Sequence, residues 1–219
     1  LPVSSSGHLA LAEHFFGVSS PGVTFEVFVH FGTALAVLWF FRGRVAEILR
    51  ACCGWALRRK HDAGDARLAL LILIGTVPAA AIGLAFDELV GELFDSPVLV
   101  SIMLLVTGVV LWLTRRIPAG GRGSETLRDA VLIGLAQAAA IMPGISRSGS
   151  TIAAGLGLGL ERRRAAEFAF LLSIPVILGA TVASVGDVTR VGGAALWTTA
   201  AGTAAAFASA IPAIAVLMK

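Results

Sequence analysis

Five long runs of apolar residues dominate the chain and are separated by polar segments. Each run is close to the roughly 20 residues that an α-helix needs to cross the hydrocarbon core of a bilayer. Apolar and polar residues do not alternate within the runs, as they would in a half-buried strand. The pattern therefore predicts an all-α, polytopic membrane protein with spans at Val23 to Phe41, Leu68 to Phe86, Pro97 to Leu113, Phe168 to Val185 and Ala194 to Leu217.

Three shorter apolar stretches lie beside polar segments rich in Gly and Ser: Leu9 to Phe16, Ala130 to Met142 and Ile152 to Leu160. Each is too short to cross a bilayer as a helix. We therefore expect two re-entrant helix–loop–helix hairpins, one near the start of the chain and one around residue 147. Irregular backbone at membrane depth is tolerated only where it is buried in protein or lines a cavity.

The basic residues indicate which loops are cytoplasmic. Arg is dense in segments 42–67, 115–128 and 162–164, whereas segment 87–95 is acidic and has no Lys or Arg. By the positive-inside rule the first three segments face the cytoplasm and the fourth lies outside. The chain between the second and third basic segments must then enter and leave the membrane on the same side.

Local signals predict some details of these elements. Val45 to Leu57 is expected to form an amphipathic helix on the membrane surface. Gly75 and Pro78 are expected to kink the second span. Gly17 to Gly22 is predicted to be a turn, and Gly186 to Gly193 an outer loop.

Composition supports a membrane protein and argues against other classes. The 219 residues are 57% hydrophobic and 14% charged, whereas a soluble domain is typically about a quarter charged. The basic residues behind the net charge of +3 flank apolar spans, so nucleic-acid binding is not indicated. Cys52 and Cys53 are adjacent, a spacing that argues against a structural disulfide or a zinc site.

The most polar stretch between the short apolar segments is Pro143-Gly144-Ile145-Ser146-Arg147-Ser148-Gly149-Ser150-Thr151. It has no acid and resembles a loop that leads into a helix N-terminus, where backbone N–H groups and the helix dipole favour an anion. Arg147 adds a planar fork suited to phosphate oxygens, and Gly144 and Gly149 allow close backbone approach. We therefore expect a phosphate or diphosphate ligand. The alternative is a polar loop whose Arg reaches the lipid surface.

An internal repeat links this motif to the start of the chain. Ser4-Ser5-Ser6-Gly7-His8 matches Ser146-Arg147-Ser148-Gly149-Ser150, and a proline precedes each copy. Each copy is followed by a short apolar stretch and a glutamate, Glu26 or Glu167. Counting spans gives the halves, about 1–114 and 128–219, opposite topology within one membrane domain. Inverted repeats place a polar site near the midplane, where broken helices meet.

If the two motifs meet, they form a phosphoryl-transfer site. Arg147 would stabilise charge on the phosphate oxygens, and His8 would carry a proton. Ser5, three residues before His8, would be a nucleophile or a hydrogen-bond donor. Glu26 and Glu167 are intramembrane acids, interpreted as braces for the broken helices. The remaining histidines, His14, His30 and His61, are interpreted as structural.

At these residues the chain resembles a known family. LPVSSSGH and PGISRSGST are similar to the two signature stretches of the bacterial undecaprenyl-diphosphate phosphatase family, which is associated with bacitracin resistance. The resemblance extends over essentially the whole chain, including TFEVFVHFG and AEFAFLLSIP. It implies a multi-pass plasma-membrane hydrolase that converts undecaprenyl diphosphate to the monophosphate and orthophosphate, recycling the lipid carrier of cell-wall synthesis from the outer leaflet.

The resemblance also implies roles for single residues. Ser5, His8 and Arg147 would be catalytic, and a phosphate site would be lined by Ser4, Ser6, Ser146, Ser148 and Thr151. The family has a glutamate pair just before LPVSS that would hold a divalent metal, Mg²⁺ or Ca²⁺. This pair would lie upstream of Leu1, and a further C-terminal span is also missing, so we expect the chain to be truncated at both ends.

The sequence alone is also compatible with other functions. Inverted repeats with broken helices are also a transporter design, so a polyprenyl-phosphate flippase is the main rival. A structural membrane subunit would leave the polar repeat unexplained. The attacking group is Ser5 in one route and a metal-bound water in the other. A homodimer is left open.

Overall fold

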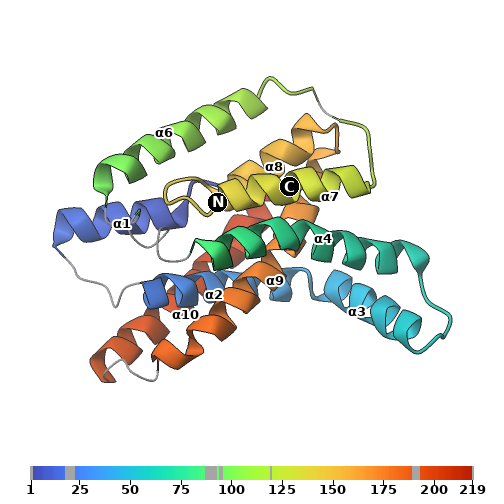
Figure 1. Cartoon of the computed structure of the whole chain (residues 1–219), viewed down its shortest axis with the longest axis horizontal. Coiled ribbons are helices and arrows are strands. Elements are labelled where there is room, and N and C mark those ends of the chain that lie inside the picture. The colour runs from blue at the N-terminus through green and yellow to red at the C-terminus, as the bar shows by residue number, and fades with distance from the viewer. Residues whose placement is uncertain are drawn as a thin grey trace.

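The computed structural model describes residues 2–17, 23–86, 93, 96–118, 120–188 and 193–218. These residues are helical apart from connecting turns and one isolated β-bridge between Arg122 and Leu160. The helices (Figure 1) are α1 (Ser5–Phe16), α2 (Val23–Phe40), α3 (Arg42–Ala56), α4 (Ala63–Ala85), α6 (Pro97–Thr114), α7 (Leu127–Ala139), α8 (Arg147–Gly157), α9 (Arg162–Val188) and α10 (Gly193–Leu217). The all-α prediction is confirmed.

Among the described residues, four helices are long and apolar enough to cross a membrane: α4, α6, α9 and α10. A fifth candidate is α2 together with α3, which turns away through 82°. α4 begins at Ala63 rather than at the predicted Leu68, because the Asp62 side chain caps it and accepts a hydrogen bond from the Asp65 N–H (2.9 Å). α4, α6, α9 and α10 therefore coincide with four of the predicted spans, with ends that differ by a few residues.

Two local predictions need correction or qualification. α9 continues to Val188, so Gly186 to Val188 belong to a helix and not to the predicted outer loop. Intrahelical hydrogen bonding outweighs the weak helix propensity of Gly186 there. α4 runs without interruption through Pro78, and Gly75 acts as a packing point. The predicted turn at residues 17–22 and most of segment 87–95 lie outside the described residues.

α3 leaves the bundle at the end of α2, as Figure 1 shows on the right. It contains most of the predicted surface helix, and Leu49 and Trp55 on it are 58% and 68% exposed. Exposed apolar side chains beside several arginines suit the boundary between lipid and water. The helix is confirmed, and its place on the membrane surface stays a prediction.

The core forms where α4, α7 and α9 pack together. Phe168 and Leu172 of α9 and Ile133 of α7 are almost fully buried. α7 approaches α4 so closely that a Cβ atom on Gly134 would lie 2.4 Å from the carbonyl oxygen of Gly75. Small residues at such crossings let helix backbones touch, which is the usual basis of packing in membranes. This contact fixes α7, the first helix of the predicted second hairpin.

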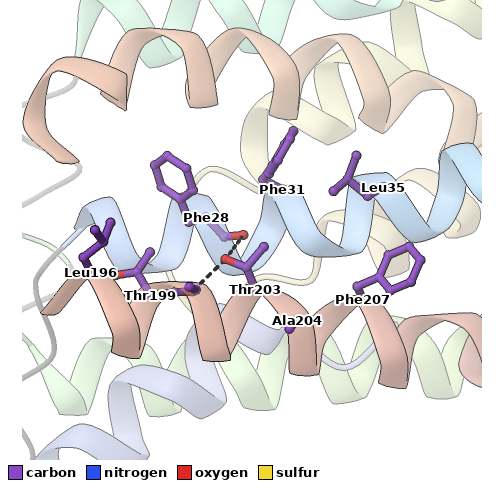
Figure 2. Close-up of a pocket in the computed structure, with 9 residues that line it drawn as sticks. Phe28, Phe31, Leu35, Leu196, Thr199, Thr203, Ala204 and Phe207 are labelled. Atoms are coloured by element: carbon purple, nitrogen blue, oxygen red, sulfur yellow. Dashed lines mark hydrogen bonds between the residues drawn. The ribbon is translucent and has the colours of Figure 1, made fainter. Parts of the chain in front are cut away.

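An apolar groove of about 520 Å³ runs between α2 and α10 (Figure 2). Its walls include Phe28 and Phe31 of α2, and Thr203 of α10 donates a hydrogen bond to the Phe28 carbonyl (3.1 Å). Successive residues of an α-helix are rotated by about 100°, so Glu26 and His30 project from the other side of α2. The groove is therefore separate from the polar residues of α2.

Candidate active site

The two polar motifs fold in the same way. Each begins a helix, and a serine caps each helix: the Ser4 hydroxyl accepts from the Gly7 N–H (3.3 Å), and the Ser146 hydroxyl accepts from the Gly149 N–H (3.1 Å). Serine is among the preferred N-cap residues because its oxygen satisfies an otherwise unpaired N–H. The paired caps match the repeat read from the sequence, position by position.

The motifs also lie against each other. A Cβ atom on Gly7 would be 2.9 Å from the Cα atom of Gly144, and one on Gly149 would be 3.1 Å from the carbonyl oxygen of Pro2. Glycine is needed at these points because any side chain would push the two segments apart. The N-termini of α1 and α8 therefore converge, and each carries the partial positive charge of a helix dipole.

α6 supports this junction from one side. Gly144 has a left-handed backbone (φ +93°), and its missing Cβ would lie 2.5 Å from the Val100 carbonyl oxygen and 2.7 Å from the Met103 Cβ. Thr107, also on α6, donates from its hydroxyl to the Gly144 carbonyl (2.9 Å) and accepts from the Ser146 N–H (3.0 Å). Thr107 is not predictable as a site residue from the sequence, where its signal is a lone hydroxyl in the middle of an apolar span.

Ser5 and His8 lie one turn apart on α1, so their side chains project from the same side of the helix. Both residues are exposed. The His8 ring donates from Nδ1 to the Ser4 carbonyl (2.8 Å). A carbonyl oxygen is an acceptor, so this bond places the proton on Nδ1 and leaves Nε2 of the neutral ring free to accept one. Gly7, a weak helix former, does not interrupt this helical turn.

Arg147 is the first residue of α8 and is half-buried. Within the described part of the chain it forms no ion pair. A guanidinium without a carboxylate partner at a helix N-terminus is available to an anionic ligand. His30 of α2, interpreted from the sequence as structural, lies close enough to Arg147 for their charges to interact. His30 therefore belongs to the surroundings of the site.

The predicted phosphate-lining residues fall into two groups. Ser4, Ser146 and Thr151 are at most 4% exposed, and Ser4 and Ser146 serve as caps. The Thr151 hydroxyl donates to the carbonyls of Arg147 (2.8 Å) and Ser148 (3.3 Å) within its own helix. Ser6 and Ser148 are half-buried, so their hydroxyls and the backbone N–H groups of the two helix starts are the donors that a ligand could reach.

The two predicted bracing acids lie in different settings. Glu26 interacts electrostatically with Glu13 of α1, within the first half of the chain. Glu167 pairs with Arg44 of α3 (3.2 Å) and with Arg164 of its own helix (3.8 Å). These ion pairs tie α9 to α3 and not to α8, so the bracing role of Glu167 stays a prediction without a contact behind it.

The base of the α7–α8 hairpin is held by a clasp centred on Arg122, in the loop before α7. Arg122 donates two hydrogen bonds to the Asp129 carboxylate (2.7 and 3.0 Å) and one to the Leu158 carbonyl at the end of α8. Burial alone would raise the pKa of Asp129, but hydrogen bonds from Arg122 and Thr126 hold this pKa below its usual value. In the sequence this segment is recognisable only as a basic loop.

No group of three or more His, Cys, Asp or Glu side chains that could hold a metal ion occurs in the described ranges. The residues described here therefore do not fit a divalent-metal site by themselves.

Comparison with known proteins agrees with the two motifs. A family model described as bacitracin resistance protein BacA matches residues 1–219. A protein of Gemmatimonas aurantiaca is 42% identical over 100% of this chain and 82% of its own length. One of Desulfosudis oleivorans is 50% identical over 85% of this chain and 72% of its own length. One of Methanobrevibacter smithii is 41% identical over 86% and 72% respectively. All three relatives bear the name undecaprenyl-diphosphatase.

Proposed function

The chain belongs to the bacitracin resistance protein BacA family, and from this premise we propose that it is an undecaprenyl-diphosphatase. It is a membrane hydrolase that converts undecaprenyl diphosphate to undecaprenyl monophosphate and orthophosphate. The observation that carries this function is the convergence of two serine-capped helix N-termini, one bearing Ser5 and His8 and the other Arg147. Two helix dipoles and a guanidinium without an acidic partner favour a ligand with several negative charges.

The terminal phosphate binds between the two helix starts. Arg147 contacts its oxygens through the guanidinium fork, and the charge that develops on those oxygens during transfer is stabilised there. Ser6 and Ser148 supply further hydroxyl donors. The polyprenyl tail extends from this site into the bilayer.

In the first of two routes, the Ser5 hydroxyl attacks the terminal phosphorus while Nε2 of His8 takes its proton. The bond from that phosphorus to the bridging oxygen breaks, and His8 returns the proton to the departing oxygen. Water then attacks the phosphorus of the phospho-serine and loses a proton to His8. The bond from phosphorus to the Ser5 oxygen breaks, His8 gives the proton to that oxygen, and orthophosphate leaves. In the second route water attacks the terminal phosphorus directly and loses a proton to Nε2 of His8, the bond from that phosphorus to the bridging oxygen breaks, and His8 gives the proton to the departing oxygen. Ser5 then only donates a hydrogen bond to a phosphate oxygen.

Two further features belong to the proposal. A divalent cation, Mg²⁺ or Ca²⁺, is expected from the family resemblance, and it would be held by residues other than those described here. The site opens toward the outer leaflet of the plasma membrane, because counting spans from the Arg-rich cytoplasmic loops places the first hairpin outside.

The proposed sidedness is tested by single cysteines at Gly123 and Arg163, introduced after Cys52 and Cys53 are replaced. Both positions flank the α7–α8 hairpin, so a membrane-impermeant thiol reagent should reach both from the cytoplasmic face. Labelling from opposite faces would remove the re-entrant hairpin and the inverted repeat with it.

The activity is tested by orthophosphate release from undecaprenyl diphosphate by the purified protein in detergent. Release by the wild type and its loss in Arg147→Ala would support the hydrolase. A lipid flippase, the rival function, would move undecaprenyl phosphate across vesicle membranes without releasing orthophosphate. That outcome would overturn the proposal.

A further inference from the structure

The hydroxyl of Thr107 is used differently from those of two other threonines in the long helices. Thr76 of α4 and Thr181 of α9 each donate to the carbonyl four residues earlier in their own helix, both at 2.8 Å. This is the ordinary way for a threonine to satisfy its hydroxyl in an apolar span. The hydroxyl of Thr107 instead makes both of its hydrogen bonds to another segment, 37 and 39 residues away in the chain.

The two partners of Thr107 stand on either side of a sharp turn. It donates to the carbonyl of Gly144 and accepts from the N–H of Ser146, which caps α8. One hydroxyl therefore closes the turn that leads directly into Arg147. Thr107 is 5% exposed, so water cannot easily replace it as a partner for these two backbone groups.

We propose that Thr107 is a positioning residue for the diphosphatase reaction. Its hydroxyl fixes the turn at Gly144 to Ser146, and this fixes the direction in which Arg147 leaves the start of α8. Because Leu104, one turn away on α6, lies against Gly7, the same helix holds both motifs. α6 thus sets the spacing between Arg147 and the pair formed by Ser5 and His8.

The inference rests on the proposed function and makes a distinct kinetic claim. Arg147 acts mainly on charge that develops during phosphoryl transfer, so a misdirected guanidinium lowers kcat more than it raises KM. A threonine that merely filled space in α6 would affect stability and leave both constants of the folded protein unchanged.

The test compares Thr107→Val, which keeps the shape and removes the hydroxyl, with Thr107→Ser, which keeps the hydroxyl. Orthophosphate release is measured per mole of monodisperse protein. We expect kcat of Thr107→Val to fall about 10- to 100-fold with KM changed less than about threefold, since small errors in position are costly to catalysis. Thr107→Ser should restore kcat to within about threefold of the wild type.

Thr181→Val is the matched control, because it removes a buried hydroxyl that bonds only within its own helix. It should leave kcat unchanged. If Thr107→Val is not recovered folded, Thr107→Ala is compared with Thr107→Ser in the same way. The inference would be overturned if the variant without the hydroxyl had the same kcat as Thr107→Ser and the wild type. A wild type that releases no orthophosphate would instead overturn the proposed function.

Discussion

Replacing Gly144 by alanine tests whether the junction of the two motifs sets the activity. Gly144 has φ +93°, a conformation that favours glycine. A left-handed backbone costs an ordinary L-residue about 1–2 kcal/mol. In addition, the new methyl carbon would lie 2.5 Å from the Val100 carbonyl oxygen and 2.7 Å from the Met103 Cβ. Both contacts are with parts of α6 that cannot rotate away.

The size of the effect follows from these distances. Ordinary van der Waals contact begins near 3.4 Å, so the turn must move about 0.9 Å away from α6 to relieve the closest clash, which weakens both hydrogen bonds to Thr107. A displacement near 1 Å at a catalytic group can reduce catalysis about 100-fold. That factor corresponds to about 2.7 kcal/mol of transition-state stabilisation.

The assay is kcat/KM for orthophosphate release from undecaprenyl diphosphate, together with the unfolding temperature in detergent. Gly108→Ala is the control, because Gly108 adjoins Thr107 on α6 and a Cβ there would meet nothing within 4 Å. We expect Gly108→Ala to retain full activity. If folded Gly144→Ala kept kcat/KM within about threefold of the wild type, the packing of α6 on the turn could not be what positions Arg147.

Three other predictions follow from the site. Arg147→Lys keeps the charge but loses the fork, so its kcat for orthophosphate release should fall at least about 100-fold, whereas near-normal turnover would make Arg147 a lipid anchor. On the Ser5 route, Ser5→Ala should abolish turnover, and His8→Ala should slow both formation and hydrolysis of the phospho-serine, with labelled phosphate accumulating on Ser5 only where hydrolysis is slowed more; substantial turnover by Ser5→Ala would leave direct attack by water. Asp129→Asn should lower the unfolding temperature near neutral pH, and this difference should shrink as the pH falls through the lowered pKa of Asp129, because protonation removes the same charge.

The sequence predicts the helices well because the hydrophobic pattern and the helix caps depend on residues that are close together in the chain. The long apolar runs identify the membrane helices, and their ends move by a few residues where a cap such as Asp62 extends a helix. The serine caps of α1 and α8 follow from short motifs whose hydrogen bonds span three residues. The same motifs identify Ser5, His8 and Arg147 as candidates for one site.

The supporting residues could not be predicted, because their partners are distant in the chain. Thr107 looks like any hydroxyl in an apolar span until its partners near residue 145 are known. His30 lacks polar neighbours in sequence, and only the packing of α2 brings it near Arg147. Glu167 was paired with Glu26 by repeat symmetry, but its ion pairs depend on the direction in which α3 leaves α2.

The clasp at Arg122 bears on the order in which the chain is assembled during synthesis. Arg122 emerges from the ribosome 36 residues before Leu158, so its pairing with Asp129 does not have to wait for α8. An ion-paired carboxylate costs less to bury than a free one, so the pair lowers the penalty for packing Asp129, which is 2% exposed, into the bundle. The bond to Leu158 can form only after α8 has been made and has packed beside α7. Arg122 therefore first orders the start of α7 and later holds the end of α8.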